Sequence, residues 1–223
     1  SLHNATWYCD GSLVLGRWAP FRTTGFGIAV VASDGELIGF GYGTPPSRIY
    51  TAAAAELWAM QVAVSLSPPM PYIKTDCLFI LTSARAGTSA VTAHNKPLAR
   101  IWNSIAATID RDVAQLVERG LWQWIPAHLS ITAVGDTTAH GKSRLSMVDW
   151  RANRQVDALA KRGAVIGAPI EETIALVKGA ETLLEHRLAQ LAQASHRANN
   201  RSVTSLDAEG KWTTKVLRES TSR

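Results

Sequence analysis

The sequence predicts an α/β fold with a mixed five-stranded sheet, helices on both faces of the sheet, and a helical tail at the C-terminus. Two observations predict this class. Short apolar segments with strand-like patterning alternate with longer segments of helical periodicity, in the order β-β-β-α-β-α-α-β-α. Three consecutive strands joined by tight turns and two strands reached through helices imply both antiparallel and parallel pairs in one sheet.

The five expected strands are short, and residues typical of turns bound several of them. Ser33, Asp34 and Gly35 favour a hairpin turn between the second and third strands. Asp10 is expected to end the first strand, before a Gly-Ser turn. The predicted strands cover residues 5–10, 25–32, 35–43, 71–76 and 121–128.

The helices are expected where apolar residues recur every three to four positions. Thr51 is a suitable N-cap for the first helix, and Pro68 is a strong stop signal after it. Asp149 is expected to cap the last helix of the sheet domain, and Gly163 to lie just past its end. The predicted helices cover residues 51–67, 77–86, 95–120 and 149–163.

The composition divides the chain into three parts. Residues 1–162 hold the predicted sheet and its helices, and residues 163–200 form a helical appendage after a linker that contains Pro169. Residues 201–223 are polar and are expected to form a flexible tail. Because the sequence starts at Ser1 rather than at a methionine, we also expect the chain to be cut from a longer polypeptide.

The bulk composition sets limits on location and partners. The 223 residues contain two cysteines, which predicts an intracellular protein, cytoplasmic or nuclear, without a disulfide framework. No apolar run approaches the ~20 residues of a membrane span, so no membrane partner is expected. The formal net charge of +5 permits a polyanionic partner such as a nucleic acid.

Four carboxylates stand out by their positions. Asp10 and Asp76 follow two strands that are expected to be parallel neighbours, so their side chains should meet at one edge of the sheet. Glu56 lies in the helix before the second of these strands, and Asp157 lies in the last core helix. Such a group would repel itself and would be neutralised by hard divalent cations such as Mg²⁺ or Mn²⁺.

Five stretches that carry these acids resemble the motifs of type 1 ribonuclease H, in the order found in that family. They are "YCDGS", "AAAELWAMQVAV", "YIKTDC", "WQWIPAH" and "ANRQVDALAK", and they cover residues 5 to about 162. The resemblance implies cleavage of the RNA strand of RNA–DNA hybrids by a two-metal-ion mechanism that leaves a 5′-phosphate. It implies two Mg²⁺ ions, for which Mn²⁺ may substitute, and four metal ligands: Asp10, Glu56, Asp76 and Asp157.

The resemblance also implies roles for residues around the acids. His128 is expected to assist proton transfer or product release, although the long loop over 129–148 contains a second candidate, His140. Asn153 lies one helical turn before Asp157 and is expected to contact the substrate. Gly11 and Ser12 are expected to lie against the sugar-phosphate backbone, where Gly11 permits a close approach.

Structural interpretations of the same residues stay open at this point. Asp10 suits a turn before glycine, and Asp76 suits an N-cap of the helix that follows it. Asp157 has possible ion-pair partners in Arg154 and Lys161, at helical spacing.

Three functions compete at the level of sequence. An active hybrid-cleaving endoribonuclease is favoured by the four acids. A catalytically inactive binding or scaffold module of a larger polyprotein is the alternative, because residues 87–95 contain no Lys or Arg where some members carry a basic protrusion. A DNA nuclease of the same fold is the third. Domains of this type in retroelements borrow affinity from an attached reverse transcriptase, so a retrotransposon fragment with that partner is also expected.

Overall fold

The computed structural model describes residues 4–67, 70–136 and 144–217. It divides the chain into two compact units, Ser1–Ala168 and Pro169–Arg223. Each unit has its own sheet: a five-stranded sheet in the first and a two-stranded sheet in the second.

The first unit is built on a mixed five-stranded sheet, as the sequence predicts. The strand order is β3-β2-β1-β4-β5. The three N-terminal strands form antiparallel pairs, and β4 lies parallel to both β1 and β5. The strands are β1 (Thr6–Val14), β2 (Thr23–Val31), β3 (Leu37–Gly43), β4 (Tyr72–Thr75) and β5 (Trp122–Trp124).

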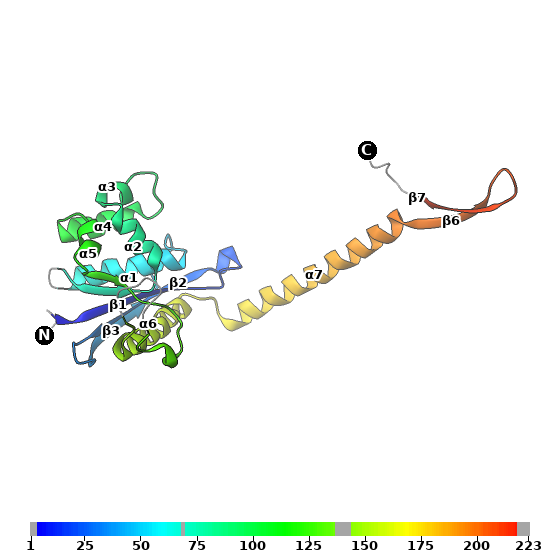
Figure 1. The fold of residues 1–223 in the computed structure, drawn as a ribbon. Coiled ribbons are helices and arrows are strands. Elements are labelled where there is room, and N and C mark those ends of the chain that lie inside the picture. Colours follow the sequence, from blue (N-terminus) through cyan, green and yellow to red (C-terminus); the bar gives the residue numbers. More distant parts are fainter. Residues whose placement is uncertain (1–3, 68–69, 137–143, 218–223) are drawn as a thin grey trace. The chain divides into compact units, whose positions relative to one another are not determined.

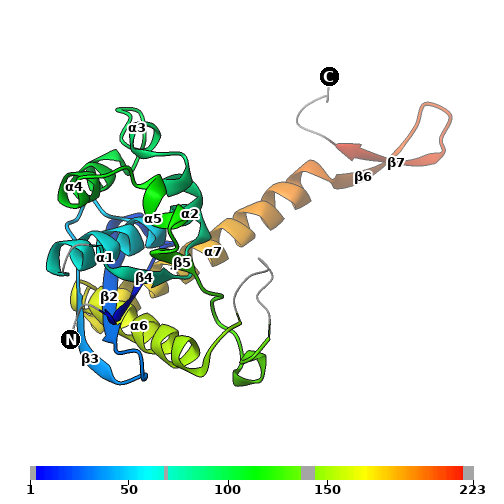
Figure 2. The same ribbon diagram turned by 60° about the vertical axis from the view of Figure 1, so that its left-hand side comes forward.

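Helices cover both faces of this sheet, which confirms the predicted layers. Five helices lie on one face, and α6 crosses the other face against β1 and β2 (Figures 1 and 2). The helices are α1 (Ala52–Leu66), α2 (Leu78–Arg85), α3 (Thr88–Val91), α4 (Ala99–Ile109), α5 (Ala114–Glu118) and α6 (Met147–Ile166). The larger of two apolar cores lies on the five-helix side and contains Trp7, Leu57, Met60 and Trp122.

The first strand does not end at Asp10, and this prediction was wrong. β1 continues through Gly11 and Ser12 to Val14, because β2 pairs with it along the whole length, from Thr6↔Val31 to Val14↔Thr23. On its other side, β1 pairs with β4 only as far as Tyr8↔Lys74. Asp10 therefore sits where β1 loses one neighbour and the sheet opens.

The helix expected over residues 95–120 is two helices. α4 ends at Ile109, and the next residue, Asp110, adopts a left-handed conformation with a φ of 50°. The carboxylate of Asp112 then accepts hydrogen bonds from the backbone N–H groups of Thr88 and Ala114, at 3.0 and 2.9 Å. These bonds fix a turn between α4 and α5, so the apolar periodicity does not continue as one helix.

The predicted ends of α6 also differ from the observed ones. Ser146, not Asp149, is the N-cap, and its hydroxyl accepts a hydrogen bond from the backbone N–H of Asp149 at 3.0 Å. Gly163 lies inside the helix rather than past its end. A Cβ at Gly163 would come within 2.4 Å of the carbonyl oxygen of Gly43, so glycine lets α6 pack directly on β3.

The second unit contains one helix and one hairpin. α7 (Glu171–Asn199) lies within residues 163–200, the predicted helical appendage, and β6 (Arg201–Leu206) pairs antiparallel with β7 (Trp212–Leu217). This hairpin lies in the stretch that the sequence assigns to a polar tail. The signal for this hairpin is a turn in which Asp207 accepts from the N–H of Lys211, between two short runs with β-branched residues. Within the described parts of the chain, no helix is both long and apolar enough to cross a membrane.

Candidate metal centre

Three of the four predicted acids come together at the opening beside β1. The parallel register Tyr8↔Lys74 places Asp10 level with Asp76, two residues further along each strand. Glu56 reaches the same point from α1. One carboxylate oxygen from each of the three residues lies within 4.8 Å of the others. Asp10 and Glu56 are buried, and Asp76 is half-buried.

Gly11 fixes the distance between the first two acids. A Cβ at this position would lie 2.2 Å from the backbone nitrogen of Glu56 and 2.5 Å from the carbonyl oxygen of Ala52. Any side chain there would push α1 away from β1 and would separate Asp10 from Glu56. Gly11, which is expected to permit a close approach of the substrate backbone, therefore also permits α1 to pack directly on β1.

The carboxylate of Glu56 is held by donors at the end of β4. The hydroxyl of Thr75 donates to Oε1 of Glu56, and the backbone N–H of Cys77 donates to the same oxygen at 3.1 Å. The backbone N–H of Gly11 donates to Oδ1 of Asp10 at 2.7 Å. Each of these buried carboxylates thus has a fixed orientation and keeps another oxygen for a ligand.

The three acids have raised pKa values. Burial raises the pKa of Asp10 to about 7, and the charge of Asp76 adds to this effect. Burial and then the charges of Asp76 and Asp10 raise the pKa of Glu56, and burial raises the pKa of Asp76. The group therefore resists carrying three negative charges. A hard divalent cation with oxygen ligands, such as Mg²⁺ or Mn²⁺, fits this donor set.

Asp157 lies on the rim of this group rather than within it. Its Oδ2 forms an ion pair with Nζ of Lys161 at 2.7 Å, one turn further along α6, and the side chain is 27% exposed. It lines the same groove as Asp10 and Glu56, and its charge contributes to the raised pKa of Asp10. The ion pair that the sequence left open is thus present, although Asp157 still faces the group.

The other predicted site residues lie around the same groove. Asn153 donates from Nδ2 to Oδ2 of Asp76 at 3.4 Å, so its observed partner is an acid of the centre. His128 and Ser12 line the groove, and the charge of His128 lowers the pKa of Asp76. His128 has a φ of 52°, in the left-handed region that side chains rarely adopt. His140 lies outside the described residues.

A buried polar network beside the centre was not predicted. The carboxylate Oδ1 of Asp149 accepts from the hydroxyl of Tyr8 at 2.7 Å and from Nζ of Lys74 at 2.6 Å, and Oδ2 accepts from the Ser146 hydroxyl at 2.7 Å. Burial disfavours the charge of Asp149, but these donors outweigh burial and lower its pKa. The network joins β1, β4 and α6, and its residues Tyr8 and Lys74 each lie two positions before an acid of the centre.

Comparisons with known proteins concern the fold. No protein-family model matches the sequence, and no curated protein matches it. Solved structures that resemble the chain include a Prototype Foamy Virus protease–reverse transcriptase, RNase H1 from Halobacterium salinarum, and LC11-RNase H1 in complex with an RNA/DNA hybrid. The mixed sheet with helices on both faces is the arrangement that the sequence resemblance implies.

The strand order β3-β2-β1-β4-β5, with helices on both faces, agrees with the fold class predicted from the sequence. The viral match has 20% identity and a TM-score of 0.49, and covers 72% of this chain and 21% of the viral one. The archaeal match has 16% identity and a TM-score of 0.45, covering 71% and 96%. The third has 13% identity and a TM-score of 0.46, covering 72% and 96%. At these identities and TM-scores the likeness says nothing of activity, so the chemistry of this unit rests on its own residues.

Proposed function

We propose that the chain is an endoribonuclease that hydrolyses the RNA strand of RNA–DNA hybrids with two divalent cations. The observation that carries this proposal is the convergence of Asp10, Glu56 and Asp76 from three different elements, with oxygen atoms within 4.8 Å and raised pKa values. A structural role does not require such a costly arrangement, because isolated buried carboxylates destabilise a fold.

The three acids would hold the cations, and Asp157 would complete the set from the rim. Bound Mg²⁺ or Mn²⁺ would supply an activated water and would stabilise the charge on the leaving oxygen. Hydrolysis would join the oxygen of water to phosphorus and break the bond from phosphorus to the 3′ oxygen, which would leave a 5′-phosphate and a 3′-hydroxyl. Asn153 would hold Asp76 in position through its 3.4 Å hydrogen bond.

Other groove residues would act on the substrate and on protons. His128 would deliver a proton to the leaving oxygen or assist product release, because an imidazole can both donate and accept a proton. Ser12 offers a small donor and acceptor for the 2′-hydroxyl, the group that distinguishes RNA from DNA. Gly11 lines the groove and would lie beside the sugar-phosphate backbone, although α1 fills the space that a side chain would occupy.

The direct test is cleavage of a labelled RNA–DNA hybrid at low salt with Mg²⁺ or Mn²⁺. Single-stranded RNA, duplex RNA and duplex DNA serve as comparison substrates, and Asp10→Asn as the variant. We expect metal-dependent cleavage only of the RNA in the hybrid, and a loss of about 1,000-fold or more in Asp10→Asn, because a cation ligand is removed. Cleavage of duplex DNA alone would replace this proposal with a DNA nuclease.

A second function is favoured by one observation. Asp157 is paired with Lys161 at 2.7 Å and does not join the three-acid group, which suits a catalytically inactive binding module of a larger polyprotein. Titration with Mn²⁺ separates the two, since an active centre should raise the melting temperature as cations bind and an inactive module should not. Cleavage that appears only with an added reverse transcriptase would instead indicate an enzyme that depends on that partner.

A further inference from the structure

A second groove adjoins the candidate metal centre and has no assigned role. It has a volume of about 390 Å³ and runs between α6 and the segment that follows β5. Three of its residues, His128, Asp157 and Lys161, also line the groove of the three acids. The two grooves are therefore continuous, and a strand held at the acids would extend into the second one.

One side of this groove is formed by a positively charged side chain that stacks on an aromatic ring. The guanidinium of Arg154 lies 5.0 Å from the ring centre of Trp150, which is one helical turn earlier on α6. The indole Nε1 of Trp150 donates to the carbonyl oxygen of Leu129 at 2.9 Å, so the ring is tied from α6 to the opposite wall of the groove. The stack thus places a positive charge on a rigid support.

Arg154 is available for a ligand in a way that Lys161 is not. Lys161 is already paired with Asp157, whereas Arg154 is exposed and makes no hydrogen bond or ion pair with any other described residue. A guanidinium that stacks by its face keeps its N–H edge for an anion, and its fork of donors matches the oxygens of a phosphate.

We propose that this groove binds a phosphodiester of the RNA strand next to the scissile one, with Arg154 as the phosphate contact. The proposal rests on the proposed function for the identity of the strand. Phosphate contacts dominate the affinity of proteins for nucleic acids. Because residues 87–95 contain no Lys or Arg, Arg154 would supply part of the affinity for the hybrid that this segment does not.

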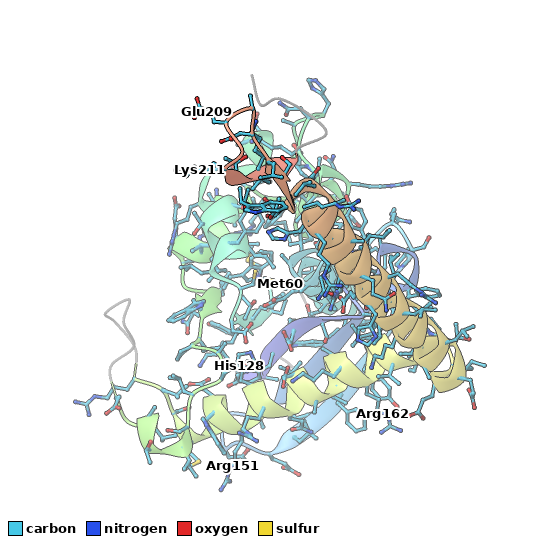
Figure 3. All side chains as sticks on the ribbon, turned by 90° about the vertical axis from the view of Figure 1, so that its right-hand side faces the viewer. Met60, His128, Arg151, Arg162, Glu209 and Lys211 are labelled. Carbon is cyan, nitrogen blue, oxygen red and sulfur yellow. The ribbon has the colours of Figure 1, made fainter. Side chains whose placement is uncertain are left out.

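The chain provides a matched control on the same helix. Arg162 stacks on Tyr42 at the same distance of 5.0 Å, but neither residue lines the groove. Arg151 is a second control, since it is exposed on α6 and Figure 3 shows it on the opposite side of the helix from His128. Each control removes one positive charge from α6 without changing the groove.

The experiment measures the affinity for a fluorescent RNA–DNA hybrid by anisotropy, at several salt concentrations and without divalent cations. The full chain with Asp10→Asn serves as the background, because this change stops cleavage and removes one negative charge beside the phosphate. We expect Arg154→Ala to raise Kd about three- to tenfold and to reduce the slope of log Kd against log salt by about 0.7 to 0.9, the value for one phosphate contact.

Arg154→Lys should keep most of the salt slope, because the charge remains, and Arg162→Ala and Arg151→Ala should leave the slope unchanged. Equal slopes for Arg154→Ala and Arg162→Ala would overturn the proposal, and so would an absence of hybrid binding by the background protein at low salt. Cleavage by the unmodified chain is measured separately. If Arg154→Ala leaves hybrid binding unchanged while the unmodified chain cleaves the hybrid, only the proposed phosphate site in the groove is rejected. If Arg154→Ala weakens binding while the unmodified chain does not cleave, the proposed enzyme activity is rejected and the phosphate site is retained.

Discussion

Two consecutive helices, α6 and α7, use their apolar residues in opposite ways. In α6, mostly small residues face the sheet and are buried: Ala152, Val156, Ala160, Gly163 and Ala164. In α7 no residue is buried, and its five leucines are 56–74% exposed: Leu176, Leu183, Leu184, Leu188 and Leu191. Small side chains allow a helix to contact backbone directly, which holds functional groups at fixed positions, whereas large ones need a matching surface.

The close contact between α6 and β2 is the largest difference between α6 and α7. A Cβ on Gly25 would lie 2.0 Å from the backbone nitrogen of Ala164, and a Cβ on Gly27 would lie 2.5 Å from the carbonyl oxygen of Val156. Both neighbours are backbone atoms, so they cannot move away as a flexible side chain would. The strand and the helix are therefore packed at the closest distance that their backbones allow.

The largest predicted effect comes from filling this contact. Gly25→Ala should lower the free energy of unfolding of the first unit by about 3 kcal/mol or more, because α6 would have to move off the sheet. Chemical denaturation followed by tryptophan fluorescence measures this change. An unchanged stability in Gly25→Ala would show that α6 and β2 are further apart than the structure has them.

The next effect concerns the polar network under the N-terminal end of α6. Lys74→Met removes the cation paired with Asp149 at 2.6 Å and leaves a buried carboxylate with only hydroxyl donors, so we expect a loss of about 3 kcal/mol. The triple variant Tyr8→Phe/Lys74→Met/Asp149→Leu removes every member of this cluster except Ser146 and should recover most of that loss. A triple variant as unstable as Lys74→Met would contradict this explanation.

A smaller effect is expected from pH, through the three acids of the centre. Asp10 has a pKa of 3.8 when unperturbed and about 7 in the folded protein, so between these values the folded state binds more protons than the unfolded state. Without divalent cations, the free energy of unfolding should therefore fall as pH rises through this window, by up to about 1.4 kcal/mol for each pH unit. Asp149, whose pKa is lowered, acts in the opposite direction, but below this window.

Denaturation curves at several pH values in the presence of a chelator measure this dependence. Asp10→Asn should flatten the curve and should be more stable than the original chain near pH 7, because the repulsion is removed. Added Mg²⁺ should also flatten it, by stabilising the ionised form. A stability that rises with pH through the same window in chelator would contradict raised carboxyl pKa values.

The smallest effect is expected in α7 and sharpens the contrast with Gly25. Gly179 lies in the middle of α7, and a Cβ there would meet no atom within 4 Å. Gly179→Ala should therefore stabilise the helix by about 0.5 to 1 kcal/mol through backbone entropy alone. Circular dichroism during thermal unfolding measures it. A destabilised Gly179→Ala would indicate that another surface packs closely at this position.

The sequence predicted most of the strands and helices because their periodicities are local patterns. It placed Asp10 and Asp76 on neighbouring parallel strands, and the pairing of β1 with β4 agrees with this. It did not predict that β1 continues past Asp10, because this depends on pairing with β2, a partner distant in the chain. The Tyr8–Lys74–Asp149 network has no sequence signature, since three elements must be in register before the groups meet.

The packing at Gly11 fixes the spacing of Asp10 and Glu56 in the candidate centre, whereas Asp157 is held less tightly. Asp10 and Glu56 are separated by two backbones in contact, so their spacing can change only if a helix leaves its strand. Asp157, in contrast, is 27% exposed and is held by one ion pair across a single helical turn. During a reaction, cations and phosphate shift by fractions of an ångström. Asp10 and Glu56 would keep their positions during such a shift, and the side chain of Asp157 would move to follow it.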